Sequence, residues 1–410
     1  MSLRAALQSA FREALRALDF AGAVRRELAD PQHAPAEGGR VFAAAVGKAA
    51  PQMMQGARDA WGARIARALV VCPDQTPCAL EEGPELAVIR AGHPLPDARS
   101  VDAGARLLEL ARQTTARDTL LVLVSGGASA LACAPNEDIG FATKLSLTHA
   151  LLGAGATIVE FNTVRRHVSR LKGGGLTRAA RGSVLALLAS DVIGGAPHDI
   201  GSGPAAPDPT TVDDARALLH RYAPAFASLP LAESLKAADS DAARARHVIV
   251  VEPELLVEYG VRALEPWHLS AVRLAPSMAS VTDLAAEYAQ LAQSLAPGQA
   301  YVRVAEPSLR IDAPNPGRGG RSGHLAALVG ADLPPGVAFL AGASDGADGT
   351  SNAAGAAVDT SFLSVVSKAH HAEHVARFDT AALHEAAGTA IVTGPTGVNL
   401  CDLHILAREL

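Results

Sequence analysis

The chain has 410 residues, of which 49% are hydrophobic, 19% charged and 4% aromatic, and its net charge at pH 7 is −6. This length exceeds what one ordinary hydrophobic core accommodates, so we expect two domains. A negative net charge and few aromatic rings argue against a nucleic-acid-binding protein, because phosphate backbones bind basic surfaces. An anionic ligand would therefore need a local pocket of cationic side chains.

No apolar run in the sequence reaches the roughly 18 residues that a membrane-spanning helix needs. Residues 3–18 repeat leucine and phenylalanine at helical spacing between arginine and glutamate, which predicts an amphipathic helix rather than a signal peptide. The cysteines show no metal-ligand spacing and are typical of reduced thiols: Cys72, Cys78, Cys133 and Cys401. We expect a soluble cytoplasmic protein that binds neither a membrane nor a nucleic acid.

After this helix, a strand over residues 41–46 runs directly into Gly47 and Lys48. Further strands follow, with helical patterns between several of them, at residues 68–72, 87–91, 119–125 and 183–190. Continuous apolar strands that alternate with helices predict a parallel sheet covered on both faces. Such a sheet binds its ligands at the carboxyl ends of its strands.

The composition changes near residues 228–241, and a second series of strands follows at residues 247–251, 301–304, 309–312, 338–341 and 390–393. We therefore predict an α/β protein of two domains, residues 1–240 and 241–410, each a mostly parallel sheet flanked by helices.

Two glycine-rich turns of the first domain follow predicted strands. Lys48 lies where a strand turns into a helix, and the free backbone N–H groups of a helix N-terminus favour an anion. An exposed lysine in a simple turn is the alternative. The second turn, Ser125-Gly126-Gly127-Ala128-Ser129, has glycines that permit the close backbone approach of an anion-binding nest, although many α/β turns have a similar composition.

Two further segments of the first domain carry charge. Residues 162–175 concentrate four cations before three consecutive glycines, and of these Arg165 and Lys172 are candidates to bind a carboxylate. A charge run of this kind is more typical of a solvated helix face, but the glycines are unusual for one. Asp191 directly follows the strand 183–190, where a carboxylate can act as a base or a Mg²⁺ ligand. The alternative is a helix N-cap or a turn residue.

The second domain has similar glycine-rich loops. The alternative for each is that its residues serve only to form a turn. Arg318 and Arg321 lie in a glycine-rich loop that leads into a helix. Two more loops, residues 344–349 and 393–399, follow strands and have a composition compatible with phosphate.

Two other motifs are rejected. Lys48 lacks the upstream glycine of a Walker A loop and is followed by Ala49. Residues 370–374 match the HxxEH string of some zinc peptidases, but they lie in a polar helical stretch with no obvious third ligand.

Taken in order, these motifs resemble the glycerate 2-kinase family that carries a C-terminal MOFRL-type domain. The resemblance spans about residues 40–405, and the matching strings are VGKAA from Val46, GHPLPD from Gly92, LVSGGASAL from Leu123, NTVRRHVSRLKGGGL from Asn162, SDVIGG from Ser190, SGPAAPDPTT from Ser202, GRGGR from Gly317, SDGADGTSNAAGA from Ser344 and TGPTGVNLCDL from Thr393.

The resemblance implies an active site in the cleft between the two α/β domains, ATP with Mg²⁺, and phosphorylation of glycerate at its 2-hydroxyl. It implies that Lys48, Asp191 and Arg321 are catalytic, with Asp191 also the metal ligand. It implies a substrate and phosphate site, which we assign to Ser125, Gly126, Gly127, Ser129, Arg165, Lys172 and Arg318. The partners would be a small hydroxy acid and a nucleotide, and a homodimer is left open. We assign the nucleotide site to the two C-terminal loops, at Ser344, Asp345, Gly346, Gly394, Thr396 and Asn399.

The chain departs from the family pattern around the expected cleft. Gly194-Gly195 stands where the family has Gly-Asp, and Ser322-Gly323-His324 replaces an Asn-Gln-Glu run. Ala305–Ser308 replaces a GGET-like string, Glu252-Pro253-Glu254 replaces a glycine–asparagine turn, and Ser344 replaces a threonine. These changes affect the expected metal binding, nucleotide binding and substrate identity more than the expected fold.

Three rival functions therefore stay open. The first is a kinase of another hydroxy acid, such as a longer sugar acid, and the second is a relative that binds ligand without turnover. The third is a hydroxypyruvate reductase, which would need a GxGxxG dinucleotide fingerprint at a strand end, and no predicted strand ends in one.

Overall fold

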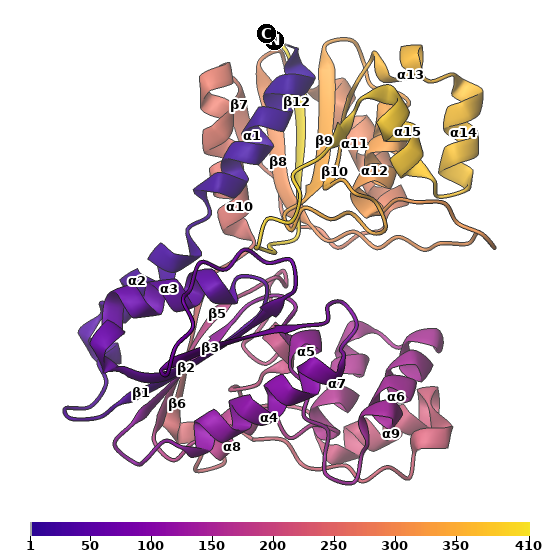
Figure 1. Cartoon of the computed structure of the whole chain (residues 1–410). Helices are drawn as coiled ribbons and strands as arrows, with labels where there is room; N and C mark the ends of the chain where they lie inside the picture. The colour runs from indigo at the N-terminus through magenta and orange to yellow at the C-terminus, as the bar shows by residue number, and fades with distance from the viewer. Residues whose placement is uncertain (1) are drawn as a thin grey trace. The chain divides into compact units, whose positions relative to one another are not determined.

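The computed structural model describes residues 2–410, which divide into two compact units (Figure 1). The N-unit comprises Phe20–Ser190 and Gly194–Val251. The C-unit comprises Glu252–Leu410, the segment that ends at Asp19, and the three residues Asp191–Ile193.

A wholly parallel six-stranded sheet forms the centre of the N-unit. Its strands lie in the order β3-β2-β1-β4-β5-β6. Their bounds are Val41–Val46 (β1), Ile65–Pro73 (β2), Leu86–Ala91 (β3), Thr119–Val124 (β4), Ser183–Ala189 (β5) and Ala245–Val251 (β6). The central strands β1 and β4 are buried along their whole length, which explains why their sequences are continuous apolar runs.

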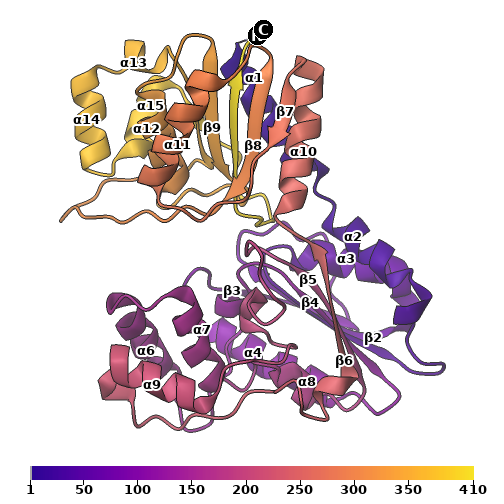
Figure 2. The ribbon, with the colours of Figure 1, turned by 180° about the vertical axis from the view of Figure 1, so that it is seen from behind.

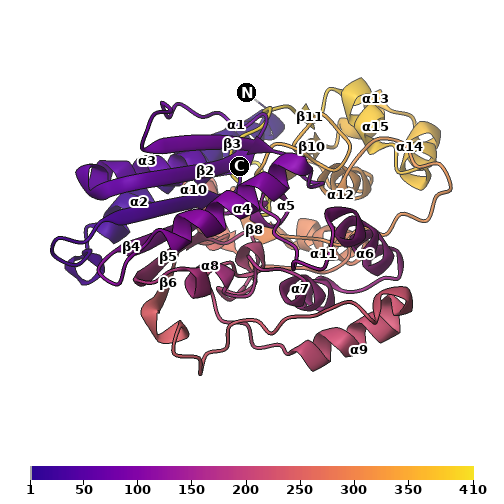
Figure 3. The ribbon, with the colours of Figure 1, turned by 60° about the horizontal axis from the view of Figure 1, so that its bottom comes forward.

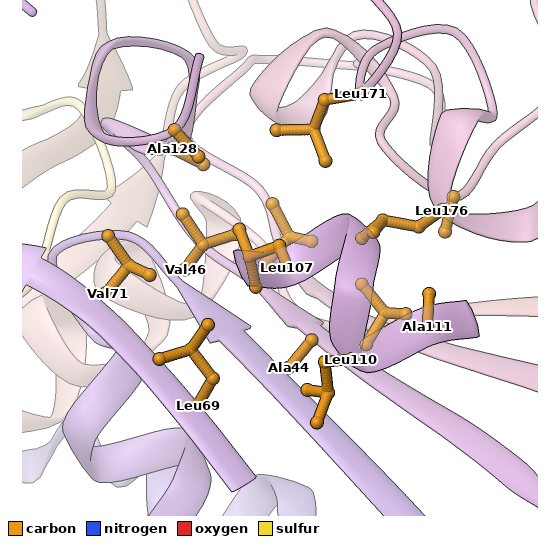
Figure 4. Close-up of a cluster of buried hydrophobic side chains, with 14 of the residues drawn as sticks. Ala44, Val46, Leu69, Val71, Leu107, Leu110, Ala111, Ala128, Leu171 and Leu176 are labelled. Carbon is orange, nitrogen blue, oxygen red and sulfur yellow. The ribbon is translucent and has the colours of Figure 1, made fainter. Parts of the chain in front are cut away.

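Helices cover both faces of this sheet. On one face lie α2 (Phe20–Leu28) and α3 (Ala50–Trp61), and on the other lies α4 (Ala98–Arg112) with the short α5 (Ala128–Leu131) and α8 (Gly175–Ala179). Figure 4 shows the second face, where alternate residues of β1 and β2 meet Leu107 and Leu110 of α4. This packing fixes the strand ends from which the site loops emerge.

Three further helices of the N-unit form a group of their own beside α4 (Figure 3). They are α6 (Phe141–Gly153), α7 (Ile158–His167) and α9 (Val212–Tyr222), and they share a separate apolar cluster that includes Leu147, Phe161 and Leu219.

The sheet of the C-unit is mixed. Its order is β11-β10-β9-β12-β8-β7, with bounds Ser270–Arg273 (β7), Gln299–Ala305 (β8), Val337–Ala343 (β9), Gly355–Asp359 (β10), Ala390–Ile391 (β11) and Asp402–Arg408 (β12). Strands β7 and β8 are parallel neighbours, whereas β12 is antiparallel to β8 and β9, and β10 is antiparallel to β9 and β11. Four of the six strands (β7, β8, β9 and β11) therefore point the same way.

Helices also cover both faces of the second sheet. Figure 1 shows α1 (Leu3–Ala17) and α10 (Glu254–Leu264) on one face, and Figure 2 shows α11 (Val281–Ser294) and α12 (Arg321–Gly330) on the other. Three short helices stand beside α12: α13 (Phe362–Val365), α14 (Lys368–Ala376) and α15 (Thr380–Ala387). The two-sheet α/β architecture expected from the sequence is confirmed.

The structure differs from the sequence-based expectations in several elements. Residues 309–312 form no strand, and the strands β7, β10 and β12 were not predicted. The strand that was expected to open the second domain is β6, which pairs with β5 and extends the first sheet to Val251. The N-terminal helix packs on the second sheet, where the ring of Phe11 lies against Gly342 of β9. Apolar periodicity indicates a buried face but does not specify the sheet that buries it.

Candidate active site

Lys48 follows β1, in a turn that the neighbouring strand β4 supports. The N–H of Lys48 donates to the carbonyl oxygen of Gly126 at 2.9 Å, and the N–H of Ala49 donates to Oγ of Ser125 at 3.0 Å. Gly47 has φ of +135°, and a Cβ there would lie 2.1 Å from Ser125 Oγ, so only glycine fits. The two predicted turns thus form one structure, in which the buried Ser125 holds the backbone that carries Lys48.

Ser129, at the start of α5, belongs to a chain of polar side chains. Its hydroxyl lies 2.7 Å from Oγ of Ser202, which in turn donates to Oδ1 of Asn162 at 3.0 Å. Asn162 and Ser202 were quoted in the sequence motifs without a role. The structure brings them together from α7 and from the segment after β5.

Two of the predicted cations converge on the same residue. Nη2 of Arg165 donates to the carbonyl oxygen of Ser129 at 3.2 Å, and Nζ of Lys172 contacts the same oxygen at 3.1 Å and Ser129 Oγ at 3.2 Å. Burial lowers the pKa of Arg165 to about 10 and sets that of Lys172 well below its usual range, since neighbouring cations add repulsion. The alternative of a solvated helix face therefore does not hold for these two side chains, which bond to Ser129; their binding of a ligand stays a prediction.

The neighbouring Arg166 has a different role. Its guanidinium bonds Asp208 Oδ1 at 3.1 Å and Asp199 Oδ1 at 3.3 Å, and both Arg166 and Asp208 are buried. This buried ion pair ties α7 to the loop before α9. Its charges are compensated, so Arg166 is structural.

In the C-unit, Asp191 is held at two points by the segment before β12. Nδ2 of Asn399 donates to Oδ2 of Asp191 at 3.0 Å, and Sγ of Cys401 lies 3.0 Å from the main-chain oxygen of Asp191. The structure thus brings together a predicted catalytic residue and a predicted nucleotide-binding residue that lie far apart in sequence.

Arg321, the first residue of α12, makes a bidentate pair with the fully buried Asp402 at 2.8 and 3.0 Å and contacts Glu306 at 3.3 Å. Although burial acts in the opposite direction, these carboxylates raise the pKa of Arg321 above its usual value. Arg318 points elsewhere: it pairs with Glu385 of α15, and both side chains are half exposed. The two arginines of the predicted loop therefore do not form one cluster.

The predicted nucleotide-binding loops interlock. Oγ1 of Thr396 donates to the carbonyl oxygen of Ser344 at 2.7 Å. The N–H of Thr396 donates to the carbonyl oxygen of Asp345 at 3.2 Å. Gly346 has φ of +86°, and a Cβ there would lie 2.0 Å from the carbonyl oxygen of Gly394. The loops after β9 and β11 therefore form a single backbone surface.

Asp348 is a candidate that the sequence reasoning missed. It is buried, and its two oxygens accept the N–H groups of Ser322 and Gly323 at 2.9 and 2.7 Å, in the first turn of α12. Burial raises the pKa of Asp348 to about 7, against the opposing effect of these two donors. The second aspartate of the string SDGADG was the available signal for this residue.

A pocket of about 480 Å³ in the C-unit collects several of these side chains. Its lining includes the polar side chains of Arg321, Asp345, Asp348, Asn399 and Asp402, together with Pro307, Ser308 and Leu309. Most of its ionisable groups are carboxylates. An anionic phosphate in this pocket would therefore depend on Arg321 or on a bound cation.

The HxxEH string has local structural contacts. Nε2 of His371 lies 2.9 Å from the carbonyl oxygen of Ala327, and His374 pairs with Asp379 at 3.3 Å. Across residues 2–410 the structure contains no group of three or more His, Cys, Asp or Glu side chains able to hold a metal ion.

Sequence comparisons identify relatives over most of the chain. Residues 6–236 match the family described as a domain of unknown function, DUF4147, and residues 295–402 match the MOFRL family. D-glycerate 2-kinase of Thermotoga maritima is 32% identical over 385 residues, which cover 89% of this chain and 90% of that protein. The chain belongs to the glycerate 2-kinase family. It is accordingly a phosphotransferase with an alcohol group as acceptor.

Two solved structures of relatives have the same fold. The crystal structure of glycerate kinase from T. maritima matches with a TM-score of 0.85 and 28% identity, covering 99% of both chains. A protein from Pyrococcus horikoshii matches with a TM-score of 0.79 and 26% identity, covering 100% of this chain and 99% of that one.

Other members of the glycerate 2-kinase family carry different names. Human glycerate kinase is 30% identical over 439 residues, which cover 88% of this chain and 83% of that protein. A protein of Agrobacterium vitis named putative hydroxypyruvate reductase is 31% identical over 337 residues, with 78% and 88% covered. Within residues 2–410, the helices lack the combination of length and apolar character that a membrane span requires.

Proposed function

We propose that this family member is an ATP-dependent kinase that phosphorylates the 2-hydroxyl of glycerate to give 2-phosphoglycerate. The observation that carries the proposal is the full-length likeness to T. maritima glycerate kinase, with a TM-score of 0.85 over 99% of both chains. Arg165 and Lys172 beside Ser129, together with the loops of the C-unit, supply groups suited to an acid substrate and to phosphates.

The groups that bind the acid would be in the N-unit. Ser129, Arg165 and Lys172 would bind the carboxylate of glycerate, because charge-assisted hydrogen bonds are the strong interactions available to a carboxylate. Ser125, Gly126 and Gly127 would shape the turn that carries Lys48. Lys48 would stabilise the negative charge of the phosphoryl group in transfer, where positioning and electrostatics supply most of the rate.

The groups that handle the nucleotide would be in the C-unit, on the loops of Ser344, Asp345, Gly346, Gly394, Thr396 and Asn399. The bidentate pair with Asp402 holds Arg321 in a fixed orientation, so we assign it the positioning of phosphate oxygens. The exposed pair of Arg318 with Glu385 is of the kind that contributes only about 0–1 kcal/mol, so Arg318 can exchange this partner for a phosphate.

Asp191 would either orient and deprotonate the 2-hydroxyl or bind Mg²⁺. The donor set fits the ion, because Mg²⁺ is usually held by one or two carboxylates together with phosphate oxygens and water. Asp191 is the carboxylate that we assign to it. The ion would supply charge neutralisation for the phosphates, while Asn399 keeps the Asp191 carboxylate in place.

The proposal is tested by release of ADP from ATP and Mg²⁺ in the presence of D-glycerate, comparing wild type with Lys48→Ala. We expect turnover to fall by about 100- to 1,000-fold, the usual cost of removing one preorganised group that stabilises transition-state charge. Lys368→Ala is the matched control, because Lys368 is exposed at the start of α14. A near-normal rate for folded Lys48→Ala would remove Lys48 from the mechanism.

The name of the A. vitis relative makes hydroxypyruvate reduction a second candidate. The turn after β1 reads VGKAA and carries a lysine in place of the GxGxxG that binds a dinucleotide. We therefore place reductase activity second to kinase activity. Oxidation of NADH or NADPH by hydroxypyruvate, at a rate comparable to ADP release with D-glycerate, would reverse this order.

A further inference from the structure

Four side chains of the N-unit form one continuous chain of hydrogen bonds. Nζ of Lys172 lies 3.2 Å from Oγ of Ser129, and this oxygen lies 2.7 Å from Oγ of Ser202. Oγ of Ser202 lies 3.0 Å from Oδ1 of Asn162. Lys172, Ser202 and Asn162 are buried, whereas Ser129 is partly exposed. Of the four members, Ser129 is therefore the one most open to a ligand.

The position of each proton in this chain follows from what each group is able to donate. Nη1 of Arg165 lies 3.4 Å from Oδ1 of Asn162. Because a guanidinium donates and never accepts, the side-chain atom of Asn162 that faces it is the oxygen. Ser202 therefore gives its one proton to that oxygen. Only Ser129 is then left to donate across the 2.7 Å contact between the two hydroxyls.

The hydroxyl of Ser129 thus directs its proton into the protein. A hydroxyl has one proton and two acceptor lone pairs, and one lone pair of Ser129 Oγ accepts from Lys172. Within residues 2–410, no third hydrogen bond reaches this oxygen, so its second lone pair is available to a ligand. Ser129 therefore offers an acceptor beside the proposed carboxylate site. It contributes to carboxylate binding by holding Lys172, not by donating its own proton.

The partner of this acceptor is a hydroxyl of the acid, because an ionised carboxylate has no proton to give. In the proposed transfer, the 2-hydroxyl oxygen bonds to the γ-phosphorus of ATP as the bond to ADP breaks. The proton of the 2-hydroxyl leaves to a base, for which Asp191 is the candidate, so this proton is committed elsewhere. The 3-hydroxyl of glycerate remains as the donor to Ser129.

We propose that Ser129 determines the specificity of the site by accepting a hydrogen bond from the 3-hydroxyl of the acid, and that Ser202 and Asn162 keep it an acceptor. This inference rests on the proposed function for the roles of the carboxylate and the 2-hydroxyl. It narrows the substrate class to 2,3-dihydroxy acids, because a 2-hydroxy acid without a donor at C3 leaves the Ser129 lone pair unpaired.

The test compares D-glycerate with two analogues of the same configuration, D-lactate and 3-fluorolactate, which carry hydrogen or fluorine at C3. Neither analogue has a donor at C3, and fluorine is close in size to a hydroxyl. Isothermal titration calorimetry without nucleotide measures the affinity, and ADP release measures kcat/KM. We expect wild type to prefer D-glycerate at least about tenfold in both measurements, because the analogues leave an acceptor unpaired.

Variants separate the acceptor role from a structural one. Ser129→Ala should bring the three acids within about threefold of one another, while its affinity for D-lactate stays within about threefold of the wild-type value. Ser202→Ala releases the proton of Ser129, so its preference for D-glycerate should lie between those of wild type and Ser129→Ala. Ser294→Ala is the control, because this exposed hydroxyl bonds to Leu291 of its own helix, and it should keep the wild-type preference.

Two results would overturn the inference. Equal affinity of wild type for D-glycerate and 3-fluorolactate refutes it without any variant. A folded Ser129→Ala variant that weakens all three acids equally would make Ser129 a structural residue.

Failure of the proposed function gives a different pattern. If D-glycerate binds with a Ser129-dependent preference and no ADP is released, the hydroxyl site stands and the kinase is wrong. If D-glycerate and 3-fluorolactate are phosphorylated with equal kcat/KM, the kinase stands and the hydroxyl site is refuted.

Discussion

Cys401 and Ser202 both have a left-handed backbone, with φ of 63° and 62°, although neither is a glycine. Such residues cost of order 1–3 kcal/mol and cluster at functional sites. Cys401 contacts Asp191, and Ser202 contacts Ser129. At the residue scale, backbone strain is therefore located beside the candidate site in each unit.

The contact between Cys401 and Asp191 leads to a prediction about catalysis. Cys401→Ala removes the S–H group that contacts the Asp191 main chain but keeps the small size of the side chain. We expect kcat to fall by about tenfold, with KM for the acid nearly unchanged and unfolding altered by less than about 1 kcal/mol, because an S–H bond is weak. Cys78→Ala, in a loop of the N-unit, is the control. An unchanged kcat for Cys401→Ala would show that the contact of the thiol with the Asp191 main chain does not contribute to catalysis.

How far single residues could be predicted depends on where their partners lie. Lys48 and Ser125 follow adjacent strands, so the sequence placed them at one edge of a sheet. The partner of Arg321 is Asp402, far along the chain on an unpredicted strand.

At the scale of elements, α7 shows why a charge run is ambiguous. Arg165 and Arg166 are consecutive and point to different surroundings, one to Ser129 and the other to Asp208 and Asp199. Helical spacing separates neighbouring side chains by about 100°. The strands β10 and β12 were missed because short apolar runs beside glycine-rich loops were interpreted as parts of those loops.

The turn before β4 gives a prediction about pH. Burial alone would raise the pKa of Asp118, but the N–H groups of Arg40 and Thr115 and their side chains lower it to about 2. A carboxylate with a lowered pKa stabilises the fold above its unfolded pKa of about 3.9, and this contribution disappears as the pH falls toward 2. Its size is about 2 kcal/mol, at 1.36 kcal/mol per pKa unit.

We therefore expect Asp118→Asn to lower the free energy of unfolding of the N-unit by about 2 kcal/mol at pH 7, and by progressively less as the pH falls from 4 to 2. Urea unfolding in a Trp267→Phe background measures this, because Trp61 of α3 is then the only tryptophan. A difference that stays constant from pH 7 to pH 2 would contradict the assignment.

At the scale of the whole molecule, the order of motifs was more informative than any motif alone. The two-domain α/β class followed from the alternation of strands and helices, and the comparisons confirm the family. The division at residue 240 differs from the units of the structure, which end the first sheet at Val251 and assign α1 to the C-unit. Those differences depend on long-range packing, such as Phe11 against Gly342, that local patterns do not contain.

The central claim is the identity of the reaction, and nuclear magnetic resonance of the products tests it most directly. The protein is incubated with ATP, Mg²⁺ and D-glycerate, and phosphorus spectra are compared with authentic 2-phosphoglycerate and 3-phosphoglycerate. We predict that 2-phosphoglycerate accumulates together with ADP, and that both form about 100- to 1,000-fold more slowly with Lys48→Ala. Formation of 3-phosphoglycerate, or no phosphorylated acid from folded protein, would contradict the account.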